Sequence, residues 1–427
     1  MMILLSLGFF FLLLASGMPI AFAFGAATVT LIPFVVSPEV LINVPQRMVS
    51  SVDVFVLLAV PMYILSGTIM ASGGVAKTMI DLAMLFVGRI RGGLGMTVIT
   101  STVLFSGISG SSSADTAAIG SITLPAMRKR GYPLPLATAI VAAGGATAVL
   151  IPPVIDLVLI GTIANISIAG LFAGALLPGL ANCIAALVLT YFIARRLGLP
   201  TEPGLPWRDI PRVLLRGIPA FGMAVIILGG ILGGIFTPTE AGGVSIVYAL
   251  LIEALIFRQL KIADLPKIIS MSARITGIVF LMLAMGSAFG WVLNFLSIPQ
   301  YVGELVTQIP NKFLFLMVVN IVFFFVGCFL ETLPVLVILL PMLMPVVIRF
   351  GIHPIHFGIL LEANLGLGFI TPPVGVVLFT ACSLSRLPLE PVVRPLLPYM
   401  IILGIMALLV TYWAGLSMFL PRLLGYA

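Results

Sequence analysis

Residues 105–131 read FSGISGSSSADTAAIGSITLPAMRKRG, and this stretch decides the fold. Serines, glycines and an aspartate fill its first half, and Arg128, Lys129 and Arg130 lie near its end. Strongly apolar sequence precedes and follows it. Polar, non-helical backbone survives at membrane depth only where protein buries it or where it lines a watery cavity. The stretch therefore predicts a re-entrant helical hairpin whose polar tip lies inside a membrane protein.

The composition of the whole chain supports this interpretation. Of the 427 residues, 61% are hydrophobic and only 8% are charged, and the mean hydropathy is +1.28. Soluble domains are about a quarter charged. We expect an all-α polytopic membrane protein whose net charge of +7 reflects basic cytoplasmic loops rather than nucleic-acid binding. Cys183, Cys328 and Cys382 lack metal-site spacing and are expected in the core. The apolar amino end, without a basic region, predicts no cleavable signal peptide.

Several apolar segments do not fit simple membrane spans, which need about 17–25 residues. We expect segments near residues 3–16, 19–36, 52–72, 94–127, 132–165, 171–194, 217–236, 239–257, 271–296, 313–347, 355–385 and 396–421. Residues 94–127 and 313–347 have a polar or proline-marked middle, which predicts hairpins. Residues 132–165 contain GGATAVLIPPV, where Pro152 and Pro153 predict a broken helix.

An internal repeat explains these irregular segments. When the chain is aligned with itself at an offset of 220 residues, no gap is needed from 105 to 178. Prolines and glycines fall in register: Pro125 on Pro345, Gly131 on Gly351, Pro152-Pro153 on Pro372-Pro373, and Pro178 on Pro398. Chance matching among apolar residues accounts for leucine on leucine, but not for this register. Interrupted segments at matching positions in two halves indicate the binding site of a transporter.

The basic residues predict that the two halves are inverted. If residues 73–93 and 128–131 are cytoplasmic, the 21 cations divide 17 to 4, and the four outside are Arg47, Lys312, Arg349 and Arg422. This bias follows the positive-inside rule. It places both termini outside, in the periplasm of a Gram-negative cell, and makes the two hairpins enter the membrane from opposite faces.

The first hairpin tip offers contacts for an anion and for a cation. Ser111, Ser112 and Ser113 can cap the returning helix, whose amino end attracts anions, so we predict that they contact substrate. Asp115 follows the tip, where it can stabilise the helix start or balance nearby cations, and we group it with them. Oxygens at the end of the first arm suit sodium, and the predicted residues are Ser106, Gly107, Ser109 and Gly110. The alternative is a polar turn in a structural loop.

The second tip, VGCFLETLPV, and the two broken helices complete the predicted site. We expect unwound carbonyls at residues 144–146 and 366–371, and the predicted sodium-binding residues here are Gly144, Gly145, Gly327, Cys328, Gly366, Gly368 and Thr371. Asn364 can donate to a substrate oxygen. Asp156, Glu331 and Glu362 are acids in apolar segments, which favours a functional role. Asp156 is grouped with the substrate contacts. Each acid can also be paired or face a subunit interface.

Two further features are expected to be structural. His353 and His356 follow Arg349 in a loop and lack a third ligand, so surface positions are favoured over a metal site. Residues 77–93, KTMIDLAMLFVGRIRGG, are amphipathic and basic, which predicts a helix along the membrane surface or against the hairpin. Residues 299–312 form the matching segment of the second half.

With these motifs the chain resembles the large membrane subunit of the tripartite ATP-independent periplasmic (TRAP) transporters. The resemblance covers nearly the whole chain. It depends on SGISGSSSADTAAIG with LPAMRKRGY, LIPPVIDLVLIG with LFAGALLPG, FTPTEAG, and NLGLGFITPPVGVVLF. Two positions depart from the family pattern: Val154 stands where serine is expected, and Val377 stands where asparagine is frequent.

The resemblance implies a sodium-driven, elevator-type importer of organic acid anions, such as C4-dicarboxylates or sialic acid, in the inner membrane. The implied partners are a small four-helix membrane subunit on a separate chain and a periplasmic substrate-binding protein. It also implies five parts: scaffold helices at 1–72, arm, hairpin and broken helix at 73–170, linking and scaffold helices at 171–296, a second arm, hairpin and broken helix at 297–390, and a C-terminal helix at 391–427. Residues 73–170 and 297–390 form the transport domain, and no cofactor is expected besides sodium as coupling ion.

Two alternatives remain. One is a stand-alone sodium/anion or ion exchanger with the same two hairpins, which needs neither partner. The other is a membrane enzyme such as a lipid-linked transferase, which needs clustered acids, cations or histidines on an aqueous face. The 14 acids and two histidines are scattered, so no enzyme is predicted. No GxxxxGK[ST] motif is present, so ATP is not expected to drive the protein directly.

Overall fold

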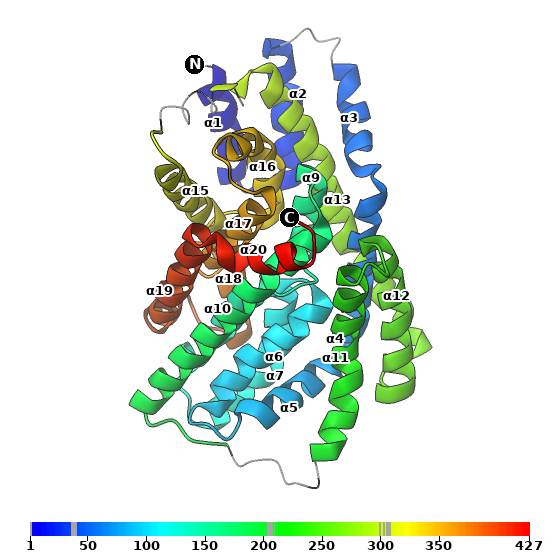
Figure 1. The fold of residues 1–427 in the computed structure, drawn as a ribbon, viewed down its shortest axis with the longest axis vertical. Helices are drawn as coiled ribbons and strands as arrows, with labels where there is room; N and C mark the ends of the chain where they lie inside the picture. The colour runs from blue at the N-terminus through cyan, green and yellow to red at the C-terminus, as the bar shows by residue number, and fades with distance from the viewer. Residues whose placement is uncertain are drawn as a thin grey trace.

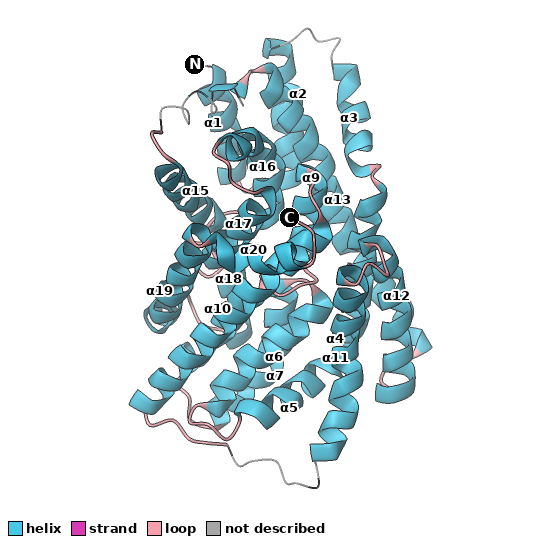
Figure 2. Ribbon diagram, viewed as in Figure 1, coloured by secondary structure: helices cyan, strands magenta, loops and turns pink. Residues whose placement is uncertain are grey.

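The structure, a computed structural model, describes residues 2–35, 41–202, 208, 210–298, 300–301, 304 and 309–427. Within this part of the chain every regular element is a helix, and loops join the helices (Figure 2). Seven of the described helices are long and apolar enough to cross a membrane. The prediction of an all-α polytopic membrane protein is confirmed.

The first half of the chain runs from the amino terminus through a long helix, α10. In chain order its elements are α1 (Met2–Ala15), α2 (Ile20–Val35), α3 (Asn43–Val52), η2 (Phe55–Leu58), α4 (Ala59–Ser72), α5 (Val75–Val87), α6 (Gly93–Ser109), α7 (Ser112–Lys129), α8 (Leu134–Ala148), α9 (Ile155–Ala164) and α10 (Ile168–Arg196).

The second half begins at α11 and repeats this plan. Its elements are α11 (Ile210–Leu232), α12 (Pro238–Leu251), η3 (Ile252–Phe257), η4 (Ile262–Asp264), α13 (Leu265–Phe295), α15 (Lys312–Gly327), α16 (Thr332–Arg349), α17 (Pro354–Gly368), α18 (Val376–Ser385), α19 (Glu390–Tyr412) and α20 (Ala414–Leu423).

The predicted repeat is visible in the helix boundaries. A shift of 220 residues carries the bounds of α7 onto those of α16 and the bounds of α8 onto those of α17, without an offset. Gly131 and Gly351, which follow α7 and α16, both have left-handed backbone, with φ of 81° and 64°. The same shift carries α9 to within one residue of α18. Both hairpins and both broken helices predicted from the sequence are therefore present.

The two halves interlock rather than lying side by side. The second segment of each broken helix packs against the returning arm of the other half's hairpin, so that α9 contacts α16 and α18 contacts α7. The outer helices exchange partners in the same way, because α2 packs on α13 and α4 packs on α12. Figure 1 shows α6 and α7 in the lower part of the molecule and α15 and α16 in the upper part. This arrangement agrees with hairpins that enter from opposite faces.

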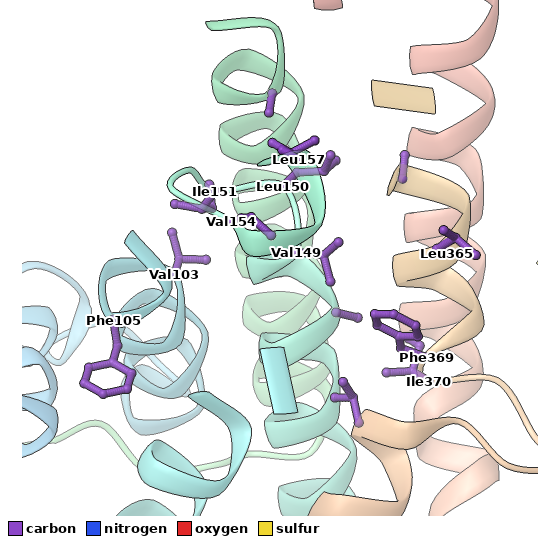
Figure 3. Close-up of a cluster of buried hydrophobic side chains, with 14 of the residues drawn as sticks. Val103, Phe105, Val149, Leu150, Ile151, Val154, Leu157, Leu365, Phe369 and Ile370 are labelled. Carbon is purple, nitrogen blue, oxygen red and sulfur yellow. The ribbon is translucent and has the colours of Figure 1, made fainter. Parts of the chain in front are cut away.

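The breaks in α8–α9 and α17–α18 meet in the core. Figure 3 shows residues 149–154 of the first break between α6, which carries Val103 and Phe105, and the second break, which carries Phe369 and Ile370. These side chains are buried. A Cβ atom added to Gly366 would lie 3.3 Å from Val149, so the two broken helices approach closely. Close packing of this kind fixes where each chain reverses.

The position of the first break corrects one prediction. Residues 144–146 are helical rather than unwound, because α8 continues to Ala148. Gly144 faces Thr102 and Gly145 faces Thr116, so these glycines allow close helix packing instead of breaking the helix. The irregular backbone lies at 149–154. In the second half α17 continues to Gly368, and the irregular backbone begins at Phe369.

Two other predictions were wrong. Residues 396–421 are not one helix, since α19 ends at Tyr412 and α20 begins at Ala414. His356 is not a surface residue: it is 2% exposed, and its Nδ1 atom lies 2.7 Å from the Ser417 hydroxyl. The α19–α20 bend allows this contact. His353 is exposed and begins α17 as its N-cap.

Other predictions have a simple outcome. The three cysteines are buried, as expected. The basic helix α5 packs against α6 and also contacts α7, which confirms that it braces the hairpin. Most of residues 299–308, the expected counterpart of α5, lie outside the described residues.

Candidate functional site

A cavity of about 580 Å³ lies where the two hairpin tips meet the outer helices. Its walls come from α4, α13, the starts of α9 and α18, the first tip at Ser109–Ala114, and the second tip at Glu331–Leu333. Both halves of the repeat therefore contribute to one cavity. Pockets where interrupted helices converge are where transporters of this architecture bind substrates and ions.

Backbone geometry at Gly110 forms the first tip. Gly110 ends α6 with a left-handed φ of 66°, and an added Cβ would lie 2.9 Å from the Pro153 carbonyl oxygen. Glycine is therefore required both by conformation and by the close approach of the first break. The N–H of Ile155 donates to the Gly110 carbonyl at 3.4 Å. The tip and the break of the first half thus form one unit.

Asp115 supports the tip from inside. It is fully buried, and Ser109 Oγ donates a hydrogen bond to its Oδ1 atom. Ser109 Oγ also accepts from the Ser111 N–H at 3.2 Å. Asp115 does not line the cavity. Of the two roles predicted for it, the structure therefore favours stabilisation of the helix start over contact with substrate.

The three predicted substrate serines do line the cavity. Ser111, Ser112 and Ser113 are half-buried, and the hydroxyls of Ser111 and Ser113 lie 3.5 Å apart. Ser111 is the N-cap of α7 and makes no side-chain capping bond. The first N–H groups of a helix lack partners within it and attract anions. The α7 amino end therefore faces the cavity as a donor group.

The other predicted sodium residues of the first half lie behind the tip. Ser106 Oγ donates to the Ala148 carbonyl at 3.0 Å, which ties the first arm to the end of α8. Gly107 is buried near Ala224 and the Pro152 carbonyl. Carbonyl oxygens of the arm and of the break therefore lie close together here, as hard cations require.

The second tip has the corresponding construction. A Cβ added to Gly368 would lie 2.5 Å from the Gly327 carbonyl carbon, so arm and broken helix touch through backbone. The N–H of Gly375 donates to the Cys328 carbonyl at 3.2 Å. Thr371 is buried, and its hydroxyl donates to the Leu367 carbonyl at 2.8 Å. The predicted residues Gly327, Cys328, Gly366, Gly368 and Thr371 thus gather behind the tip and do not line the cavity.

Acidic side chains approach the cavity from both halves. Asp156 at the start of α9 and Glu331, the N-cap of α16, line it. Glu362 is fully buried behind Asp156, and neither of its carboxylate oxygens has a hydrogen-bond partner in the described part of the chain. The buried Thr332 hydroxyl at the cavity wall also lacks one there. No group of three or more potential metal-ligating side chains occurs among the described residues.

Asn364 lies away from the cavity. Its amide donates to Asn320 Oδ1 at 2.6 Å, and the same oxygen accepts from the Thr411 hydroxyl at 2.9 Å. These contacts join α15, α17 and α19 in a buried polar cluster. The structure therefore does not place Asn364 with the predicted substrate contacts.

Sequence reasoning missed the outer wall of the cavity. This wall is almost entirely apolar and comprises Ile64, Gly67, Thr68, Ala71, Met271, Ile275, Ile278, Val279 and Met282. A Cβ on Gly67 would lie 2.9 Å from the Ser109 carbonyl oxygen, so α4 lies directly against the first tip. Apolar residues in an apolar span give no signal of a site. Only Gly67 and Thr68 could have suggested one.

Comparison with known proteins agrees with this architecture. Residues 7–416 match the family model described as "Tripartite ATP-independent periplasmic transporter, DctM component". The chain is 36% identical to the C4-dicarboxylate TRAP transporter large permease protein DctM of Pseudomonas aeruginosa, over 94% of this chain and 93% of that protein. It is 35% identical to the sialic acid TRAP transporter large permease protein SiaM of Vibrio cholerae, over 97% of each.

A solved structure supports the fold alone. The YdaH transporter of Alcanivorax borkumensis, described as having an unusual topology, superposes with a TM-score of 0.62 at 14% identity and covers 88% of each chain. The family match extends over nearly the whole chain, includes both hairpins and both breaks, and is to a transporter permease rather than an enzyme. This multi-pass membrane protein belongs to the DctM component family of the tripartite ATP-independent periplasmic transporters.

Proposed function

We propose that this chain is the substrate-carrying permease of a sodium-coupled, three-part importer of an organic acid. The observation that carries the proposal is the cavity between two hairpin tips, with paired tip-and-break units directly behind it. The relatives' names support organic acids as cargo, because one is described for C4-dicarboxylates and another for sialic acid.

Sodium is the coupling ion that suits the groups behind the tips. In each half a hairpin carbonyl accepts from the N–H that restarts the broken helix, at Gly110 and at Cys328. Further carbonyls lie close by, including those of Pro153 next to Gly110 and of Phe369 and Thr371 next to Gly375. Oxygen ligands of this kind bind hard cations, and unwound backbone in transporters coordinates sodium. No cofactor is required by this scheme.

An elevator motion follows from which parts are bonded to each other. The tips and breaks within 73–170 and 297–390 are joined by backbone hydrogen bonds and by exchanged packing, α9 on α16 and α18 on α7. The outer helices α2, α4, α12 and α13 pair among themselves. We propose that the first group moves as one body against the second, whose apolar cavity wall offers few polar contacts to break.

The two partners follow from family membership. A small membrane subunit would cover part of the lipid-facing scaffold, and a periplasmic binding protein would deliver the organic acid. The inner membrane, with both termini in the periplasm, is the location that agrees with the 17-to-4 division of cations.

Reconstituted transport tests the proposal. The chain and its small subunit are placed in vesicles, and uptake of the ligand carried by the cognate binding protein is measured. We expect uptake only with an inward sodium gradient and with the binding protein present. Uptake that continues without sodium would refute the coupling. Uptake that continues without binding protein and small subunit would identify a stand-alone exchanger.

A further inference from the structure

The cavity has an unusual charge balance for an importer of simple anions. Two carboxyl side chains, Asp156 and Glu331, belong to its lining, and no lysine, arginine or histidine is among the described residues that form it. Glu362, fully buried behind Asp156, adds a third carboxyl group within electrostatic range of it. A dianionic substrate entering this space would meet carboxylates without a basic side chain to offset them.

Carboxylates in a space of low dielectric need a cation. A buried charge is costly unless it is paired, and two nearby carboxylates raise that cost for each other. The backbone oxygens suited to sodium lie behind the two tips, on the far side from the cavity lining. The cation that approaches Asp156 and Glu331 from inside the cavity would therefore arrive with the substrate.

We propose that the imported organic acid carries a cationic nitrogen, which pairs with Asp156 and Glu331 while the substrate's carboxylate faces the amino end of α7. The inference rests on the proposed transport function and names its substrate class: a small zwitterion rather than a simple dicarboxylate. The chemistry that recognises it is a carboxylate pair for the nitrogen and helix N–H groups for the acid.

The two recognition groups are adjacent, which sets the size of the substrate. Ile155, directly before Asp156, donates its N–H to Gly110, and Ser111 follows Gly110 as the N-cap of α7. The Asp156 carboxylate and the α7 amino end therefore belong to the same tip-and-break unit. A substrate that contacts both has its opposite charges only a few atoms apart.

Independent features of the cavity support a ligand with a polar nitrogen and an apolar body. The Thr332 hydroxyl is 2% exposed, lies at the cavity wall and has no hydrogen-bond partner in the described chain. A buried hydroxyl without a partner is costly, and a ligand N–H or carboxylate would satisfy it. Opposite, Met271, Ile275, Ile278 and Met282 of α13 form an apolar surface for the substrate's carbon atoms.

Ligand binding tests the inference without any need for transport. The purified permease complex is heated with sodium and with either a panel of betaines and zwitterionic amino acids or a panel of C4 dicarboxylates. We expect at least one zwitterion to raise the melting temperature of the unchanged protein and to lose at least tenfold in affinity in Asp156→Asn. Stabilisation by dicarboxylates alone, or by neither panel, overturns the inference.

Matched variants separate substrate recognition from sodium binding. Glu331→Gln removes the second cavity carboxylate, and it decides the question if Asp156→Asn does not assemble. Asp264→Asn changes an exposed acid outside the cavity lining and serves as the control. In uptake assays we expect the KM for a zwitterion to rise about tenfold in the cavity variants, with unchanged sodium half-saturation. A raised sodium half-saturation at constant KM would assign the acids to sodium and overturn the inference.

The outcomes also distinguish this inference from the proposed function. Sodium-driven uptake of a ligand without a cationic nitrogen keeps the proposed function and overturns the zwitterion. Zwitterion binding that depends on Asp156, but without sodium-driven uptake, supports the substrate class and contradicts the proposed coupling.

Discussion

Ile155 and Gly375 stand 220 residues apart, and each donates its backbone N–H to a carbonyl of the hairpin in its own half. Ile155 bonds to Gly110 at 3.4 Å, and Gly375 bonds to Cys328 at 3.2 Å. Both donors lie where a broken helix resumes, so the same backbone bond closes the same unit twice. Such a bond leaves carbonyl oxygens of tip and break near one another. This pairing is the structural basis for two cation sites related by the repeat.

The first prediction concerns sodium at the second of these units. Thr371→Val keeps the shape of the side chain but removes one oxygen beside the second break. Loss of one ligand to a charged group should weaken sodium binding by about 1–3 kcal/mol. Sodium half-saturation for uptake should rise accordingly, by about tenfold for each 1.4 kcal/mol.

A matched control exists in the same broken helix. Thr371 and Thr380 each donate a hydroxyl hydrogen to the carbonyl four residues earlier, at 2.8 and 2.9 Å. Thr380→Val therefore removes the same kind of hydrogen bond in α18, away from the tip. Equal sodium dependence in both variants would make Thr371 structural.

The second prediction concerns the orientation of the hairpins. Lys129 at the end of α7 and Lys312 at the start of α15 are both exposed. After the three buried native cysteines are replaced, Lys312→Cys should react with a membrane-impermeant thiol reagent in intact cells. Lys129→Cys should react only when the membrane is opened. The reverse pattern would contradict the inverted arrangement and the cytoplasmic origin of the first hairpin.

Much of this arrangement could be predicted because prolines and glycines mark backbone breaks. The paired Pro-Pro sequences fixed both broken helices, and Gly131 with Gly351 fixed the ends of the returning arms. The exact start of the break could not be predicted. Gly144 and Gly145 resemble helix breakers, but in a buried membrane helix they allow Thr102 and Thr116 to approach.

The contacts that decide burial could not be predicted either. His356 resembles a loop residue until the bend between α19 and α20 brings Ser417 to it. Asn364 resembles a substrate ligand until Asn320 and Thr411 take its hydrogen bonds. These partners are 44 to 91 residues apart in sequence, so only tertiary packing reveals them. The apolar cavity wall on α4 and α13 is equally silent, because substrate-facing and lipid-facing residues share one composition.

The third prediction concerns the contact between the second arm and the second break. Gly368→Ala places a Cβ about 2.5 Å from the Gly327 carbonyl carbon, which backbone must shift to accommodate. Overpacking of this kind costs about 1–3 kcal/mol. The melting temperature of the purified complex should fall. Gly277→Ala, on an open face of α13 with no atom within 4 Å, should leave it unchanged or raise it. Equal melting temperatures in the two variants would show that this contact yields easily.

The last prediction concerns the first tip. Ser112 lines the cavity and is half-buried, and it begins α7 without packing into the core. If substrate binds at this amino end, Ser112→Trp fills its space, whereas folding should be little affected. We expect sodium-driven uptake to be lost, with binding protein present, at a nearly unchanged melting temperature. Ser121→Trp, on the exposed face of the same helix, controls for bulk and should transport normally. Normal uptake by Ser112→Trp would remove the tip from the substrate path. Loss of both uptake and thermal stability would instead show that the tip is a structural turn, since a side chain that packs into the core cannot be enlarged without unfolding cost.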